Sequence, residues 1–100
     1  MEGTGVQRDC TEAVRWYRKA AKQGHVPSQV ALGLMYARGR GVAQDHVQAY
    51  MWLNLGGSRL PSGPLRDQAA AYIGSITKHM TPAQIAEAQR LAREWKPKKE

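Results

Sequence analysis

The sequence lacks several features that would point to particular classes of protein. Among its 100 residues there is no phenylalanine and one cysteine, and 8 acidic residues stand against 15 lysines and arginines. A single cysteine excludes a disulfide within the chain. No apolar run reaches the roughly 18 residues of a membrane-spanning helix, so no membrane insertion is expected. The N-terminus lacks the basic-then-apolar pattern of a secretory signal, which favours a cytoplasmic location.

The most informative feature that is present is an internal repeat. The segment that starts at Gly3 returns 36 residues later, at Gly39. Six of fourteen aligned positions are identical, and four of those six are Gly or Trp. The identical pairs are Gly3 and Gly39, Gly5 and Gly41, Val6 and Val42, Asp9 and Asp45, Ala13 and Ala49, and Trp16 and Trp52. A period of this length is typical of helical repeat arrays.

Each copy has the signals of a glycine turn followed by a capped helix. Two glycines one residue apart suit a backbone that needs positive φ or close approach. The aspartate of each copy is a good N-cap, because its side chain can accept a hydrogen bond from a free N–H of the first turn. Glu12 and Gln48 follow three positions later, as the reciprocal half of a capping box. The alanine and tryptophan then share one helix face, where we expect the tryptophans to be in the core.

These strings resemble the Sel-1-like repeats, relatives of the tetratricopeptide repeats. The resemblance covers about residues 3–56. It implies stacked helix pairs, and a role as an adaptor in protein assemblies. The strings that carry it are Leu32-Gly33-Leu34-Met35-Tyr36 with Gly39-x-Gly41-Val42, Asp45 with Ala49 and Trp52, and Ala13-x-x-Trp16-Tyr17-x-x-Ala20-Ala21-x-x-Gly24-His25.

The expected fold is all-α, an α-α superhelix (solenoid) of antiparallel helix pairs with about five helices. The expected single domain, residues 1–100, divides into a partial repeat at 3–24, a repeat at 25–57 and C-terminal capping helices at 58–100. Apolar periodicity and caps predict the helices at about 9–23, 27–38, 45–55, 64–79 and 82–95.

The residue types of catalysis and metal binding are present without the spacing that such chemistry needs. His25, His46 and His79 lie in or beside three different turns, whereas a zinc site needs clustered ligands. The glycine pairs follow no strand and precede no Gly-Lys-Ser/Thr, which excludes a phosphate-binding loop. Cys10 is expected to be an inert or merely oxidisable thiol. We therefore expect no enzyme activity, no catalytic residue, no metal and no cofactor.

Two binding hypotheses remain. The favoured one is a module that grips a protein or peptide partner in the short groove lined by Gln29, Leu34 and Arg38. The alternative is a basic helical module for nucleic acid or another anionic surface, motivated by the net charge of +7. Nucleic acid is the less favoured partner, because the positive residues are scattered and no aromatic–basic stacking platform is present.

A further expectation concerns the N-terminal end. The first repeat has no first helix in this sequence, so apolar residues of 10–38 should be open to water. Val14, Tyr17 and Val30 are the predicted association surface. We expect either that the chain is the C-terminal part of a longer array or that two copies pack N-terminal end to N-terminal end as a homodimer.

Overall fold

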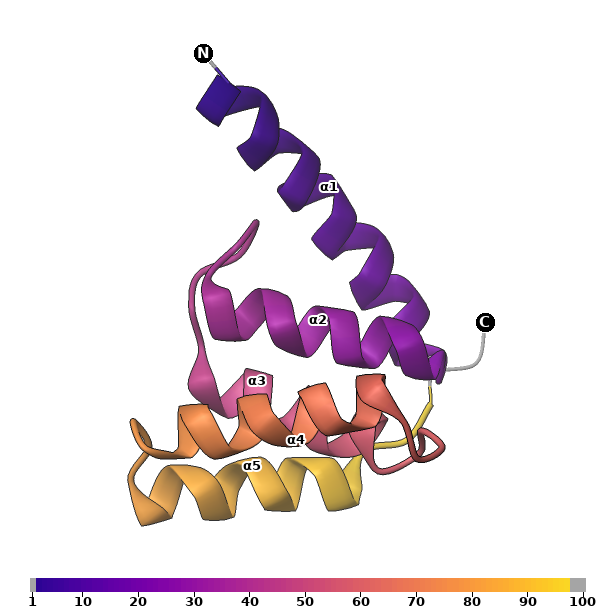
Figure 1. The fold of residues 1–100 in the computed structure, drawn as a ribbon, viewed down its shortest axis with the longest axis vertical. Helices are drawn as coiled ribbons and strands as arrows, with labels where there is room; N and C mark the ends of the chain where they lie inside the picture. The colour runs from indigo at the N-terminus through magenta and orange to yellow at the C-terminus, as the bar shows by residue number, and fades with distance from the viewer. Residues whose placement is uncertain (1, 98–100) are drawn as a thin grey trace.

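The computed structural model describes the backbone of residues 2–97 and the side chains of residues 10–97. Five helices form this part of the chain, which contains no strand (Figure 1). They are α1 (Glu2–Lys22), α2 (Val26–Arg38), α3 (His46–Gly57), α4 (Pro64–Thr77) and α5 (Pro82–Glu94). The predicted all-α helical-repeat solenoid of about five helices is confirmed. None of the described helices is long and apolar enough to cross a membrane.

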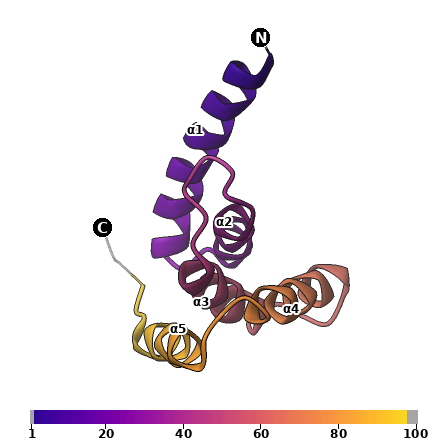
Figure 2. The same ribbon diagram turned by 90° about the vertical axis from the view of Figure 1, so that its left-hand side faces the viewer.

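Helix α3 is the centre of the arrangement. It packs against α2, α4 and α5, while α1 packs against α2. Figure 2 shows α4 and α5 on opposite sides of α3, with α1 extending away beyond α2. A helix with neighbours on so many sides must be apolar around its circumference, and α3 is. The buried apolar residues of α3 are Ala49, Met51, Trp52, Leu53 and Leu55.

Local signals in the sequence set most helix ends. The Asp45 carboxylate accepts a hydrogen bond from the Gln48 N–H at 3.1 Å, which begins α3 as predicted. Thr81 and Gln84 form the complete capping box that begins α5. The predicted return bond from Gln48 to the Asp45 N–H is wrong, because that N–H donates to the carbonyl of Tyr36 instead.

The second glycine turn closes the C-terminal end of α2. Gly39 has a φ of 66° and Gly41 a φ of 74°, both in the left-handed region that favours glycine. This path lets the N–H groups of Gly39 and Arg40 donate to the carbonyl of Met35. A Cβ on Gly41 would lie 2.4 Å from the Cys10 carbonyl oxygen, so the turn also lies against α1.

The first glycine pair does not form a turn, so the expected start of a helix at Asp9 is wrong. Helix α1 already begins at Glu2 and continues through this segment. The second turn is held by bonds to carbonyls of α2. In the first copy the backbone groups bond to one another along α1 instead, which satisfies them within the helix.

Two apolar clusters form the core, one on each side of α3. The first joins α1, α2 and α3, with partly buried residues at the end of α5 packed against it. The second joins α2, α3 and α4. The buried residues of the first are Val14, Ala21, Leu32, Met51, Trp52 and Leu55. Those of the second are Val30, Ala37, Ala49, Leu53, Ala69 and Ile76.

Helices α2 and α3 touch at glycines. A Cβ built on Gly33 would lie 2.7 Å from Leu53 Cγ and 3.0 Å from the Leu53 backbone nitrogen. A Cβ on Gly56 would lie 2.9 Å from Gln29 Cβ and 3.0 Å from Val30 Cγ2. The predicted close helix–helix approach at Gly33 is confirmed, since any side chain at either glycine would push the two helices apart.

Replacing Gly33 by alanine should therefore destabilise the protein, although alanine favours a helix by about 1 kcal/mol. We expect a net loss of about 1–3 kcal/mol, because the neighbour at the new methyl group includes backbone. The matched control is Gly74→Ala in α4, where a Cβ meets nothing within 4 Å. That variant should gain about 0.5–1 kcal/mol. Urea unfolding with unchanged m-values measures both, and a Gly33→Ala protein as stable as the wild type would contradict the tight contact.

Candidate functional site

The clearest candidate site is the part of α1 that corresponds to a buried face of α3. On α3 the four positions Ala49, Trp52, Leu53 and Gly56 are all buried. Thirty-six residues earlier, the four counterparts on α1 are all half-buried or exposed. We call these four the α1 stripe: Ala13, Trp16, Tyr17 and Ala20. The tryptophans differ most, because Trp52 is 4% exposed and Trp16 is 68% exposed.

The difference arises from the neighbours. Trp52 meets Trp95 edge-on, with ring centroids 6.1 Å apart, and the Arg59 guanidinium lies over the Trp95 ring, 5.4 Å from its centroid. Leu53 and Gly56 are covered by α2. Among the described helices only α2 packs extensively on α1, and it does so on the side of Val14 and Ala21. The α1 stripe is therefore an apolar helix face without a covering helix.

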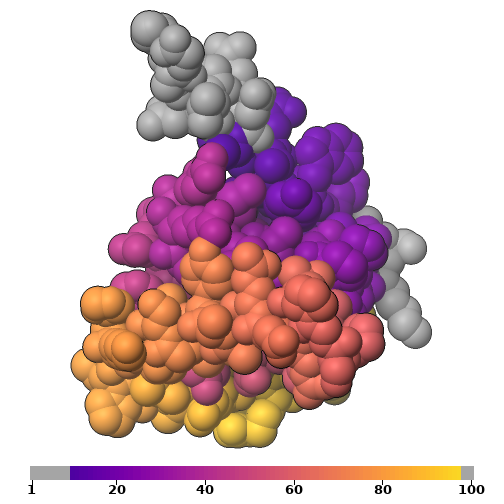
Figure 3. Space-filling model, viewed as in Figure 1, coloured from indigo at the N-terminus to yellow at the C-terminus, as the bar shows by residue number. Residues whose placement is uncertain are grey.

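Charged residues border the stripe on one side. Glu12, Arg15, Trp16 and Lys19 line a shallow depression of about 240 Å³ on the outside of α1. Arg15, Lys19 and Lys22 are exposed and follow one edge of the helix at spacings of four and three residues. No ion pair joins them to another residue within 10–97. In the space-filling view, the coloured part of α1 forms the upper right of the molecule, and the broad surface of α4 lies below it (Figure 3).

Several other cationic side chains make contacts inside the molecule. Arg18 donates to the Tyr36 hydroxyl at 3.0 Å, and Arg38 both donates to the Tyr72 hydroxyl and lies over its ring. Arg90 donates to the carboxylates of Glu87 and Glu94, and the hydrogen bond to Glu87, with the charges of both carboxylates, raises the pKa of Arg90. Lys78, Arg93 and Lys96 are exposed without an ion pair among residues 10–97, as Arg15 and Lys19 are, but Arg15 and Lys19 are the cations that line the depression beside Trp16.

The three residues predicted to line a binding groove do not come together. Gln29 is fully buried, and its Nε2 donates at 3.1 Å to the Ala21 carbonyl, which also accepts from the Gly24 N–H at the end of α1. Leu34 is half-buried against the α3–α4 cluster. Arg38 is exposed but turns to Tyr72 on α4. Gln29 and Arg38 therefore serve helix contacts on different sides of α2.

The predicted exposure of Val14 and Val30 is wrong. Val14 is 2% exposed and Val30 is 1% exposed, because α1 and α2 turn these residues into the two core clusters. Tyr17 is half-buried. Trp16, which was expected in the core, is the open residue instead. The sequence does indicate that Trp16 is exposed, because the charged residues Glu12 and Lys19 lie next to it on the helix surface, at intervals of four and three residues.

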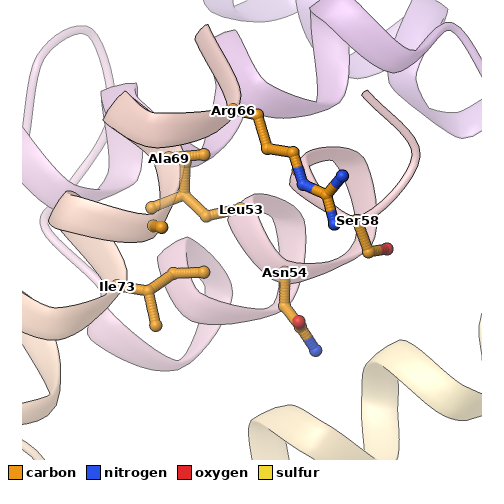
Figure 4. A pocket seen from close by; sticks show the side chains of 8 residues that line it. Leu53, Asn54, Ser58, Arg66, Ala69 and Ile73 are labelled. Atoms are coloured by element: carbon orange, nitrogen blue, oxygen red, sulfur yellow. The ribbon is translucent and has the colours of Figure 1, made fainter. Parts of the chain in front are cut away.

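Elsewhere the described surface offers no cluster of reactive groups. A second depression of about 220 Å³ between α3 and α4 has an apolar floor and a polar rim, with Arg66 as its one ionisable residue (Figure 4). Its lining residues are Leu53, Asn54, Gly57, Ser58, Arg66, Ala69, Ala70 and Ile73. His46 and His79 stack at 5.8 Å between ring centroids. Within residues 10–97 no three His, Cys, Asp or Glu side chains gather as metal ligands would. Cys10 stands 3.8 Å from the guanidinium of Arg40.

Stacked helix pairs with the same 36-residue unit at two adjacent places define an α-solenoid repeat protein. Comparison with known families places it more closely. The Sel1 repeat model matches residues 1–25 and 26–59, and the chain belongs to the Sel1 repeat family. Sel1 repeats typically mediate protein–protein interactions, and the family is generally non-catalytic.

Two curated relatives share a short segment with the chain. Both are named exopolysaccharide production negative regulator. The protein from Rhizobium leguminosarum bv. viciae is 54% identical over 39 residues, and that from Rhizobium meliloti (strain 1021) is 51% identical over 39 residues. The matched part is 39% of this chain and 15% of each relative. The chain thus spans a small fraction of the length of these relatives.

The exposure of Trp16 can be tested by fluorescence quenching. The chain has three tryptophans, and Trp16 should supply most of the red-shifted emission that acrylamide quenches. We expect Trp16→Phe to remove most of the quenchable signal. Trp52→Phe is the control and should leave quenching nearly unchanged. Equal losses in the two variants would show that α1 packs differently from the arrangement described.

Proposed function

We propose that the chain is a non-enzymatic protein-interaction module, an adaptor, and that a partner protein binds the α1 stripe. The observation that carries the proposal is the exposure of Trp16 at a repeat position whose counterpart, Trp52, is buried. Exposed apolar patches of this kind mark interaction sites on soluble proteins, and tryptophan is enriched among the residues that dominate binding energy. The typical role of Sel1 repeats supports the same function.

We also propose that residues 58–100 form the cap of the array, after a partial repeat at 3–24 and a repeat at 25–57. Two contacts support this division. Helices α4 and α5 cover opposite sides of α3, and Trp95 lies against Trp52. A cap of this kind protects the core at one end, which leaves the α1 end for binding.

The alternative function, binding of nucleic acid or another anionic surface, gains no support from the charge distribution. Arg18 and Arg38 are bonded to tyrosines, and Arg59 is stacked near Trp95, so they do not join α1 in one continuous basic surface. A homodimer formed through the N-terminal end would use the same α1 stripe. It is opposed by the net charge of +7 on each copy, which makes two copies repel one another.

The proposal can be tested with Trp16→Ala in a binding experiment on the immobilised chain. Proteins captured from the source cells would be identified by mass spectrometry, and the affinity of a purified partner would then be measured. We expect the variant to bind at least about tenfold more weakly, because a buried tryptophan anchor is lost. Leu65→Ala, which truncates another exposed apolar side chain on α4, should bind as the wild type does.

Two results would contradict the proposal. One is a partner that binds Trp16→Ala and wild type equally well. The other is the absence of any protein partner together with tight binding of random duplex DNA at physiological salt, which would favour the alternative.

A further inference from the structure

We infer that the occupant of the α1 stripe is an acidic amphipathic α-helix of the partner protein, seated on α1 much as α2 is seated on α3. The inference rests on the proposed function and specifies the partner's chemistry. Two independent observations support it: the internal example of α2 on α3, and the unpaired positive edge of α1.

The internal example indicates that the occupant is a helix. Two of the four α3 positions equivalent to the stripe are covered by α2, which brings Gly33 against Leu53 and Val30 against Gly56. The stripe keeps alanines at both ends of the same pattern, at Ala13 and Ala20. Small residues at this spacing let a helix approach closely along the stripe.

The packing of α2 on α3 also indicates how large the partner's residue can be where its helix crosses α1. Tyr17 replaces Leu53 and Ala20 replaces Gly56, so the α1 stripe is bulkier than its counterpart at both positions. A partner helix can lie as close as α2 does only if its own residue at the crossing is small. Glycine or alanine is expected there, with larger apolar residues one turn away to cover Trp16.

The charges indicate that the helix is acidic. Arg15 and Lys19 form a positive edge of the depression around Trp16 without ion pairs to other residues of 10–97, and Glu12 is the one acidic residue that lines it. Carboxylates beside the partner's apolar face would meet this edge. Such complementary pairs at the rim of an interface raise association rates and select the orientation of the partner. A second copy of this chain would bring the same positive edge, which disfavours it as the occupant.

Two synthetic helical peptides of about 18 residues would test the inference, a length at which designed sequences hold a helix. Both carry Val, Gly and Ala at the spacing of Val30, Gly33 and Ala37, which α2 buries. One has Glu and the other Lys beside this stripe. By fluorescence anisotropy at low salt we expect the Glu peptide to bind at least about tenfold more tightly. The Arg15→Glu, Lys19→Glu double variant should reverse that preference, and Gly→Leu in the Glu peptide should weaken binding.

The outcomes separate this inference from the proposed function. Equal binding of both peptides, lost in Trp16→Ala, overturns the acidic helix and leaves protein binding through the stripe intact. Binding of either peptide that survives Trp16→Ala overturns the stripe as the site, as does failure of both peptides to bind. A concentration-dependent dimer in sedimentation equilibrium that Trp16→Ala abolishes also overturns the inference, because it makes a second copy the occupant. Circular dichroism of each variant checks that the helices are retained.

Discussion

The close contact between α2 and α3 is the constraint on which the rest of the structure depends. Gly33 lets Leu53 reach the backbone of α2, and Gly56 accepts Gln29 and Val30. Once these two helices are locked together, α3 can receive α4 and α5 on its remaining sides. Every apolar face of α3 is then used within the molecule. A surface for a partner must therefore be sought outside α3, and α1, which packs extensively on α2 alone, has an apolar stripe that no other described helix covers.

Helix α1 aligns with α3 in the 36-residue repeat but does not have the neighbours of α3. Its Val14 and Ala21 are buried by α2 and α3, which fixes the rotation of the helix. The rotation of α1 determines which of its residues are exposed. Trp16 faces outward, and Arg15 and Lys19 lie beside it. The exposed tryptophan and the unpaired cations thus follow from the one contact that buries the opposite face.

The sequence predicts local features of this fold better than it predicts the site. The cap at Asp45, the capping box at Thr81 and the five-helix solenoid follow from short-range patterns, because neighbouring residues determine them. The turn expected at Gly3 is wrong, because the repeat aligns the glycines but does not specify the bonds to α2 that hold the turn at Gly39. Trp16 was misplaced for a similar reason. A repeat aligns two residues, but their burial depends on which helices lie next to each copy, and that is not local information.

The energetics of Trp16 argue that a partner must cover more than this one side chain. Burying a tryptophan removes about 150–250 Å² from water, which at about 25 cal/mol per Å² stabilises a complex by roughly 4–6 kcal/mol. Association costs about 4–15 kcal/mol in lost freedom of the two bodies, so one tryptophan offsets little beyond the low end of that range. Tyr17, Ala13 and Ala20 must add apolar contact for a complex to persist. A helix laid along the stripe reaches all four residues at once, whereas a loop tip that touches Trp16 alone does not.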